Sequence, residues 1–412
     1  MNGDDSYNKT FVSTVRLGEF SPTRHPLCPS QAWMNEALAK ADAKFLAMYK
    51  GNVNGANPRI ALEQLMWARQ LQFLCSIRSE RRLVEQITYK WLLRGLVDLT
   101  IGDTIWDHSV SSKSCDRLTE FDVVTELFDA SIELAANKWL LSGGYFLAGC
   151  TLGQTWASRT SPQRKEGSDH ERPLLKDFRG EKRTNPTHAS TTDRESWLYR
   201  KSSAVPTQLS YLRHVLTDSR HGLVVNVSVS AADGYAEQSA AATVRGDVAC
   251  RGVSVAVGVD KRYDTCGFVK ACRDIKIVSQ LTRSTRRTDG SAIGGRTTRH
   301  GGNAMRQRRR KCIGQCFGCR KMINPIRNIM VRALTKVDTL YTLTVAAHNL
   351  GLVPPWPKFV CRPRCVVENR RNYSQGPWSK TGIRLEVAQM RKHCAHKSVN
   401  MRFDMQHFLQ PS

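Results

Sequence analysis

One carboxylate in this sequence directly follows an apolar run of the kind that forms a buried strand. Residues 254–260 (SVAVGVD) are largely apolar up to Asp260, which is typical of a strand covered on both faces. An ionised side chain at such a place costs free energy unless it has a partner. In sheets that carry helices on their faces, binding sites collect at the carboxyl ends of strands. Asp260 is therefore the first candidate functional residue, and its partners must come from other elements.

Cysteine and histidine side chains offer a second chemistry, zinc binding. Three cysteines share one face of a predicted helix, and later residues could complete a tetrahedral site: Cys312, Cys316, Cys319, Cys361, Cys365, Cys394, His393 and His396. The later residues lie in a stretch without a predicted fold, which would have to bring the two groups together. We therefore expect free thiols, buried or half-buried, and no zinc. His188 and His300 have no partner at ligand spacing, and we expect them in polar loops or facing DNA.

The charge balance indicates a polyanionic partner. The chain holds 62 Lys and Arg against 36 Asp and Glu, a formal net charge of +26, which repels itself unless a polyanion offsets it. Residues 282–311 carry ten Lys and Arg against one Asp, and an earlier basic stretch is interleaved with aromatic residues. We expect phosphate contacts from Lys182, Arg183, Arg296, Arg299, Arg306, Arg308, Arg309 and Lys311. The alternative for residues 282–311 is a solvated surface without a partner. The alternative for the earlier basic and aromatic stretch is a plain polar linker.

The first third of the chain is predicted to be helical. Residues 1–57 form an N-terminal arm with one helical stretch, and residues 58–141 show apolar positions at three- and four-residue spacing, which predicts an all-helical domain. Helices joined by short polar turns are compatible with a DNA-binding helix-turn-helix, although this signal alone is weak. No run of eighteen apolar residues is present and the start is polar and acidic, so we expect no membrane segment and a cytoplasmic protein.

From residue 142 to 355 the pattern predicts a mixed β-sheet with flanking helices, and hence an α+β protein overall. A strand over 145–152 is followed by a basic insertion near 153–205 and a hairpin over 209–230. A helix near 234–244 and a strand-helix-strand over 254–280 complete the predicted sheet. The tail, residues 356–412, is basic and shows no periodicity, so its structure cannot be predicted.

An ordered set of motifs over residues 20–355 resembles bacterial insertion-sequence transposases of the DDE type, in the insertion-sequence-five group. The motifs include SIRSERRLVEQITYKWLLRGLVDL, WDHSVSSKSCDRL, YFLAGCTLGQTWAS, DFRGEKRTNPTHASTTD, RHGLVV, DKRYDT, GRTTRH and TLTVAAHNLGLVP. The resemblance implies an N-terminal domain that recognises the terminal inverted repeats of double-stranded DNA, and a catalytic domain of ribonuclease-H-like fold that also engages target DNA. It further implies that three carboxylates hold two Mg²⁺ ions, because paired hard cations need several oxygen anions.

Carrying the resemblance over residue by residue leaves one acid of three. The second acid matches Asp260, although Arg262 replaces a glycine that is usual there. The first acid position is Gly149, in AGCTLGQTWAS. The third is Gly314. The stretch around it, RKCIGQCFGCRK, keeps the expected Arg310, Phe317, Gly318 and Lys321, while a tyrosine expected earlier in that helix is Asn303.

No nearby carboxylate can replace the missing acids. The sequence has no Asp or Glu between Glu133 and Glu166, and none between Asp289 and Asp338. We therefore expect the fold of a transposase, with a homodimer as one possible assembly. Although the family is one of enzymes, we expect Mg²⁺ binding to be lost or weak and strand cleavage to be disabled. The alternative function is a non-catalytic DNA-binding protein of the bacterial nucleoid that inhibits or regulates transposition by active copies.

Overall fold

A computed structural model describes the chain in segments. These are residues 25, 27–50, 60–142, 144–157, 162–164, 185–200, 206–233, 256–260, 263–274, 277–281, 291–292, 313–314, 316–317 and 328–352. All of them belong to one compact unit, Met1–Arg362. The helix expected near 234–244 and the basic tail at 356–412 lie outside the described residues. None of the described helices is long and apolar enough to cross a bilayer.

Within the described residues, six helices precede the first strand, as the apolar spacing predicts. They are α2 (Leu27–Lys50), α3 (Leu62–Leu74), α4 (Glu80–Tyr89), α5 (Trp91–Leu96), α6 (His108–Glu120) and α7 (Val123–Asn137). Local signals fix some of their starts: the Ser79 side chain accepts a hydrogen bond from the Arg82 amide, and the Asp107 side chain accepts one from the Ser109 amide. The described residues between 60 and 142 form no strand.

The helices share one hydrophobic core that extends beyond the predicted domain limits. Trp33 and Leu38 of α2 pack in this core with residues of α3 to α7, and the Trp33 indole N–H donates to Ser131 Oγ at 3.0 Å. Leu343 and Leu350, from the far end of the chain, belong to the same cluster. Residues on both sides of positions 57 and 141 thus pack in the same core. The domain limits at these two positions stay predictions.

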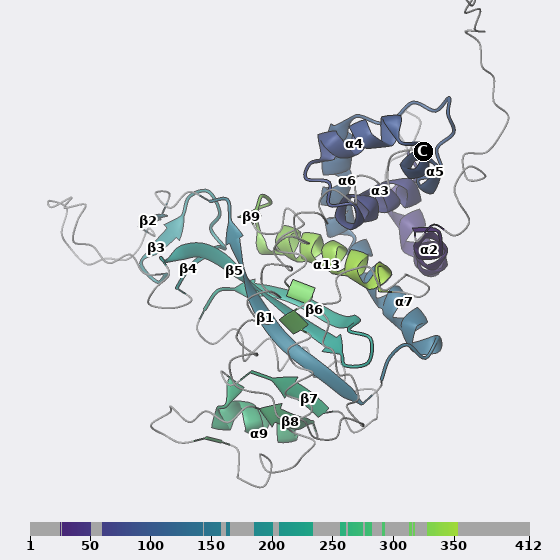
Figure 1. Cartoon of the computed structure of the whole chain (residues 1–412). Coiled ribbons are helices and arrows are strands. Elements are labelled where there is room, and N and C mark those ends of the chain that lie inside the picture. Colours follow the sequence, from purple (N-terminus) through teal and green to yellow (C-terminus); the bar gives the residue numbers. More distant parts are fainter. Residues whose placement is uncertain are drawn as a thin grey trace, which may run out of the picture. The chain divides into compact units, whose positions relative to one another are not determined.

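The strands build one mixed sheet and a separate two-stranded ribbon (Figure 1). The sheet contains β1 (Tyr145–Thr155), β4 (Trp197–Tyr199), β5 (Gln208–Asp218), β6 (Val224–Ala231), β7 (Ala256–Val259), β8 (Val278–Leu281) and β9 (Asn328–Ile329). Its order is β4-β5-β1-β7-β8, with β6 also beside β5 and β9 also beside β1. The strand, the hairpin and the strand-helix-strand expected from the sequence are all confirmed, and the described chain is α+β.

Strand directions change at β1, which is the centre of the sheet. The β1–β5 and β5–β6 pairs are antiparallel, whereas β1–β7 and β7–β8 are parallel. Helix α9 (Cys266–Asp274) connects β7 to β8, as a parallel pair requires. The ribbon joins β2 (Pro162–Arg164) to β3 (His188–Ser190). His188, expected in a polar loop or facing DNA, instead begins β3 and is only 8% exposed.

The last described helix, α13 (Leu334–Leu350), packs against β6 and against the helices α3 and α7 (Figure 1). Its Asn349 side chain donates to the Val224 carbonyl at 2.7 Å and accepts from the Val224 amide at 2.9 Å. Asn349 thus replaces a neighbouring strand at the start of β6. Such contacts satisfy an edge that would otherwise present unpaired backbone groups.

Candidate functional site

The register of the parallel pair brings Gly149 level with Asp260. Leu147 of β1 and Gly258 of β7 are the last pair of this ladder, and continuing the same register by two residues puts Gly149 opposite Asp260. Side chains of a strand alternate between faces, and the positions two residues after a matched pair share the face of that pair. Both residues therefore lie at the same face of the sheet, where β7 has just ended.

A helical segment from much later in the chain packs onto Gly149. A Cβ atom placed on Gly149 would lie 2.7 Å from Ile313 Cγ2 and 3.3 Å from Phe317 Cε2. Gly314 lies in this same segment, and nothing lies within 4 Å of a Cβ atom placed on it. The structure thus packs the segment that carries Gly314 onto Gly149, and the β1–β7 register extends from Leu147 and Gly258 towards Gly149 and Asp260.

The surroundings of Gly149 are apolar. Its neighbour Ile313 is 7% exposed and belongs to a hydrophobic cluster with Leu147, Val215 and Tyr341. Cys316 is 2% exposed in this cluster, so its side chain is buried, as expected. Among the residues that the structure describes, no three His, Cys, Asp or Glu side chains are grouped as a metal would require.

The nearby Asp264 has a structural role that the sequence did not indicate. Its carboxylate is 1% exposed and accepts hydrogen bonds from Ser291 Oγ at 2.7 Å and from the Ala292 amide at 3.0 Å. Asp260, by contrast, is half-buried, and its backbone carbonyl accepts from the Tyr263 amide at 3.0 Å. Asp264 therefore ties the loop after β7 to residues 291 and 292, while the Asp260 side chain lies closer to solvent.

A buried polar cluster on β5 was also missed by sequence reasoning. Both carboxylate oxygens of Asp193 accept from the Tyr211 hydroxyl, at 2.8 and 2.9 Å. Burial, together with this carboxylate, raises the pKa of Tyr211. Arg213 is 2% exposed, donates to the Leu152 carbonyl at 3.0 Å and lies 5.2 Å from the centre of the Tyr341 ring, and burial lowers the pKa of its guanidinium. The only signal for this cluster was a charged residue within an apolar strand pattern.

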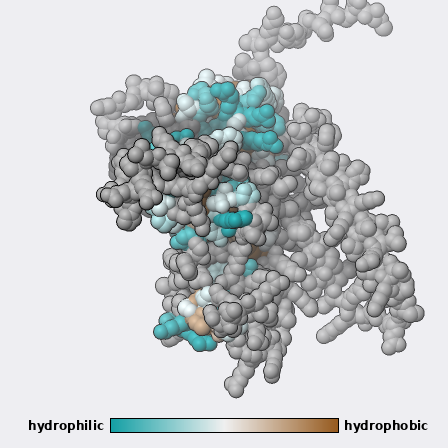
Figure 2. All heavy atoms as spheres, turned by 90° about the vertical axis from the view of Figure 1, so that its left-hand side faces the viewer, coloured by the Kyte–Doolittle hydropathy of each residue, from teal (hydrophilic) through white to brown (hydrophobic). Residues whose placement is uncertain are grey.

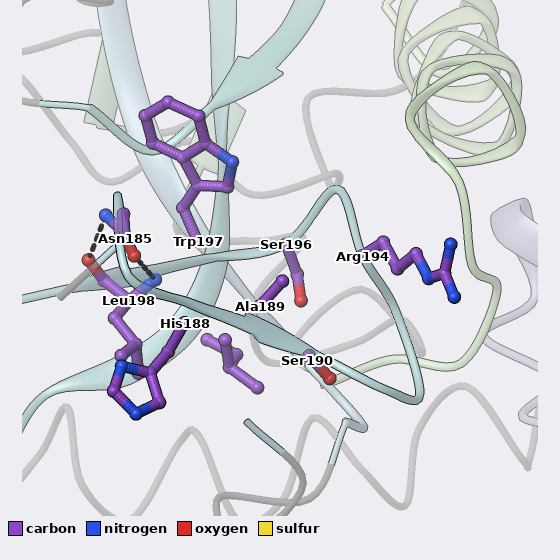
Figure 3. A pocket seen from close by; sticks show the side chains of 9 residues that line it. Asn185, His188, Ala189, Ser190, Arg194, Ser196, Trp197 and Leu198 are labelled. Carbon is purple, nitrogen blue, oxygen red and sulfur yellow. Dashed lines mark hydrogen bonds between the residues drawn. The ribbon is translucent and has the colours of Figure 1, made fainter. Parts of the chain in front are cut away.

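A small pocket between the ribbon and β4 is too small for a substrate (Figure 3). Its volume is about 10 Å³, enough for one water molecule. Asn185 closes one side of this pocket. Its side chain donates to the Leu198 carbonyl at 3.0 Å and accepts from the Leu198 amide at 2.8 Å (Figure 3). The pocket is therefore a packing feature of the β3–β4 connection.

None of the predicted phosphate contacts falls within the described residues. The following predicted residues lie outside the described segments: Lys182, Arg183, Arg296, Arg299, Arg306, Arg308, Arg309, Arg310, Lys311 and Lys321. The same holds for Arg262, His300, Asn303, Gly318, Cys312, Cys319, Cys361, Cys365, His393, Cys394 and His396. The roles expected for them stay predictions.

A basic and aromatic surface is present on the described helices. Arg78, Arg81 and Arg82 are exposed at the start of α4, and Tyr89 and Trp91, at its end, are 67% and 53% exposed. On the face seen in Figure 2, the described residues are mostly hydrophilic, with hydrophobic colour confined to small areas. The start of α4 can therefore offer arginine side chains to an anionic partner without further rearrangement.

Comparison with known proteins places the helical part of the chain. Residues 15–117 match the sequence model of a family described as "Transposase domain (DUF772)", less than half of the chain. A search of curated proteins found no match. A solved structure described as "Crystal structure of a pre-cleavage Mos1 transpososome" is similar at 10% identity and a TM-score of 0.19, over 72% of this chain and 80% of that chain. So low a TM-score supports no conclusion on the fold. What the comparisons show is therefore a similarity of residues 15–117 to this transposase domain.

Proposed function

We propose that the protein is an insertion-sequence transposase of the DDE type that binds DNA but has lost strand cleavage. The observation that carries this proposal is that the segment of Gly314 packs on Gly149 through Ile313 and Phe317, while the β1–β7 register, continued by two residues, puts Asp260 opposite Gly149. The resemblance assigned the three metal-binding acids to these positions, which are far apart in sequence. Their proximity supports the assignment, and two of the three have no side chain.

The sheet supports a ribonuclease-H-like catalytic domain. A strand that holds the first acid position, an antiparallel hairpin and a parallel strand-helix-strand lie in one mixed sheet. The second acid position follows the strand parallel to the first, where sites collect in such sheets. This is the arrangement that we expected of the family's catalytic domain.

The side chains at this place do not fit a pair of Mg²⁺ ions. Each ion prefers near-octahedral oxygen coordination, and a two-metal site needs several carboxylate oxygens. Gly149 supplies none, and an Ile313 methyl group lies where the carboxylate stem would pass. Asp260 is the one carboxylate among the three positions. We therefore derive no cleavage step for this chain.

DNA binding is supported by the charge of the chain and by its helical part. The formal net charge is +26, the match over residues 15–117 is to a transposase domain, and arginines are exposed at the start of α4. We propose terminal inverted repeats and target DNA as the ligands. A chain that binds element ends without cutting them would compete with active copies, so an inhibitor or regulator of transposition is the second candidate function. The loss of acids at an otherwise well-packed site favours it.

One set of assays tests both functions. The purified chain is incubated with labelled duplexes that carry the inverted repeats flanking its gene, in Mg²⁺ or Mn²⁺. We expect salt-sensitive shifted bands and no cleavage. Gly149→Asp with Gly314→Glu, in an Ile313→Ala background that makes room for the aspartate, should recover strand cleavage. The same triple variant with Asp260→Asn is the matched control and should stay inactive.

Each outcome has a distinct meaning. Cleavage by the unmodified chain would show that the acids were wrongly placed. If the chain did not bind the duplexes at low salt, the proposal of DNA binding would be wrong, and both candidate functions would be wrong with it. A folded, DNA-binding triple variant that remains inactive would mean that other replacements, such as Asn303, also disable the site. Inhibition of an active copy by the unmodified chain would establish the regulatory function.

A further inference from the structure

Three strands of the sheet run in one direction and end at the same edge. The long central strand β1 is parallel to β9 and antiparallel to β5, and β4 is also antiparallel to β5 (Figure 1). The strands β1, β4 and β9 therefore share a direction. Their carboxyl ends lie beside the start of β5, at the kind of edge where ligands collect in sheets covered by helices.

The register of β1 and β9 brings a tryptophan and a methionine side by side at this edge. Thr155 of β1 pairs with Ile329 of β9, and the Trp156 amide still donates to the Ile329 carbonyl at 2.9 Å. Continuing this register by one residue puts Trp156 beside Met330. Paired residues of neighbouring strands have their side chains on the same face, so these two side chains form one surface.

An aromatic residue of β4 lies in the same row. Gln154 of β1 pairs with Ser210 of β5, so a step of two residues puts Trp156 level with Gln208, the residue that pairs with Tyr199. Neighbouring strands are about 4.8 Å apart, which places Trp156 and Tyr199 about 10 Å from each other across β5. The row thus spans four strands.

The row is exposed at its outer members and supported from behind. Trp156 and Met330 are 65% and 64% exposed. Half-buried side chains pack behind them on the buried Leu212 and Ala232: Leu152, Trp197 and Tyr199. We call this surface, from Met330 and Trp156 to the side chains behind them, the aromatic face. Trp156 comes seven residues after Gly149, and alternate residues of a strand face opposite sides, so the aromatic face lies opposite the predicted acid positions.

The charged side chains that border the aromatic face are mainly basic. Arg332 is exposed and follows Met330 by two residues, and Arg194 is exposed in the connection between β3 and β4. The neighbouring Glu195 carboxylate accepts from the Leu334 amide, which holds these two connections together and occupies the one acid there at the start of α13. Aromatic side chains beside arginines suit unpaired nucleic-acid bases, because a ring stacks on the base while a guanidinium contacts the phosphate.

The size of the exposed area favours a base over a protein partner. One tryptophan side chain can bury about 150–250 Å². A stable protein interface covers about 800 Å² on each partner, which Trp156 and Met330 together do not approach. One base, in contrast, is matched by one indole ring.

We propose that the aromatic face binds unpaired bases of DNA. The Trp156 indole stacks on one base, the Met330 side chain lies along its edge, and Arg332 and Arg194 contact the adjoining phosphates. Stacking uses only the flat face of a base, so the contact tolerates any sequence, whereas a fully paired duplex keeps these faces inside its own stack. The inference rests on the DNA binding proposed above and adds the part of the DNA that the sheet contacts.

The test measures how much unpaired bases add to DNA binding by the full purified chain. A fluorescent hairpin duplex of the element end is compared, by anisotropy at fixed salt, with the same hairpin carrying a single-stranded thymine extension. We expect the extension to raise affinity at least about fivefold, the lower end of what one stacked base contributes. This gain is a ratio within one protein, so a general change in DNA affinity does not alter it.

Variants assign the gain to the aromatic face. Trp156→Ala should remove it, and Trp156→Phe should keep part of it, because a smaller ring can still stack. Trp139→Ala is the matched control, since it removes an indole that is 84% exposed at the end of α7, and it should keep the full gain. With 5-iodouracil in the extension, ultraviolet light should cross-link the DNA to peptides that contain Trp156 or Met330, identified by mass spectrometry.

The outcomes separate this inference from the proposed function. A hairpin that binds without any gain from the extension would overturn the inference and leave DNA binding in place. A chain that binds neither DNA would overturn both. Equal loss of the gain in Trp156→Ala and Trp139→Ala, or cross-links only to other peptides, would also exclude the aromatic face. A second copy of the chain seated on this face would give the first of these results.

Discussion

Replacing Gly149 should reveal how tightly the late segment packs on β1. A Cβ atom at this position would lie 2.7 Å from Ile313 Cγ2, about 1 Å inside an ordinary carbon–carbon contact. Overpacking of this kind costs about 1–3 kcal/mol, and removing a strand glycine returns about 0.5–1 kcal/mol. We therefore expect Gly149→Ala to lower the free energy of unfolding by about 1–2 kcal/mol.

The partner residue makes the reasoning testable by a double-mutant cycle. Ile313→Ala removes the methyl group that meets the new Cβ, and alone it should cost about 2 kcal/mol or more as a buried truncation. With the clash gone, the double variant should be more stable than the sum of the single effects by about 1–2 kcal/mol. Urea unfolding followed by tryptophan fluorescence measures all four proteins.

Gly314 supplies the contrast. Nothing lies within 4 Å of a Cβ atom at this position, and a helical glycine is about 1 kcal/mol less favourable than alanine. Gly314→Ala should therefore leave the stability unchanged or raise it. Additive effects of Gly149→Ala and Ile313→Ala, or a Gly149→Ala protein as stable as the unmodified chain, would refute the packing described for this site.

Three other predictions concern pH, DNA and the sheet edge. Burial lowers the pKa of His214 to about 4, below its ordinary 6.5, so the unfolded chain takes up this proton first and the free energy of unfolding falls as pH drops from 6.5 towards 4. Between pH 7.5 and pH 5, urea unfolding should show that the unmodified chain loses about 2 kcal/mol more than the His214→Gln variant. Equal losses in the two proteins would contradict this. Arg81→Ala with Arg82→Ala should weaken DNA binding and reduce the slope of log affinity against log salt by about 2, whereas an unchanged slope would exclude α4 from the interface. Asn349→Leu leaves both backbone groups of Val224 unsatisfied and should cost about 2–5 kcal/mol in urea unfolding, and a loss below about 1 kcal/mol would mean that another group replaces the amide.

Local patterns were enough to predict the elements that position the site. The apolar run before Asp260, the hairpin signal around Gly222 and the helix after Asp264 correspond to β7, β5–β6 and α9. The resemblance, not the local pattern, selected Gly149 as the partner of Asp260, and this assignment stays a prediction.

The contacts between distant segments could not be predicted in this way. The packing of Ile313 on Gly149 and the bonds of Asn349 to Val224 join residues whose local sequences carry no sign of each other. Arg213 is a charged residue in a strand, and only its three-dimensional surroundings show that it is buried among carbonyl and aromatic groups. His188 is likewise buried in a three-residue strand that its local sequence did not indicate.

The position of Asn349 also bears on how the chain folds during synthesis. Val224 leaves the ribosome 125 residues before the amide that completes its backbone hydrogen bonds, and Leu343, Ala347 and Leu350 reach the helical core equally late. Until that helix emerges, the nascent protein carries an open strand and an incomplete core, both of which favour aggregation. A stop codon upstream of residue 349 should therefore yield insoluble product, whereas one placed after residue 352 should leave the described fold complete.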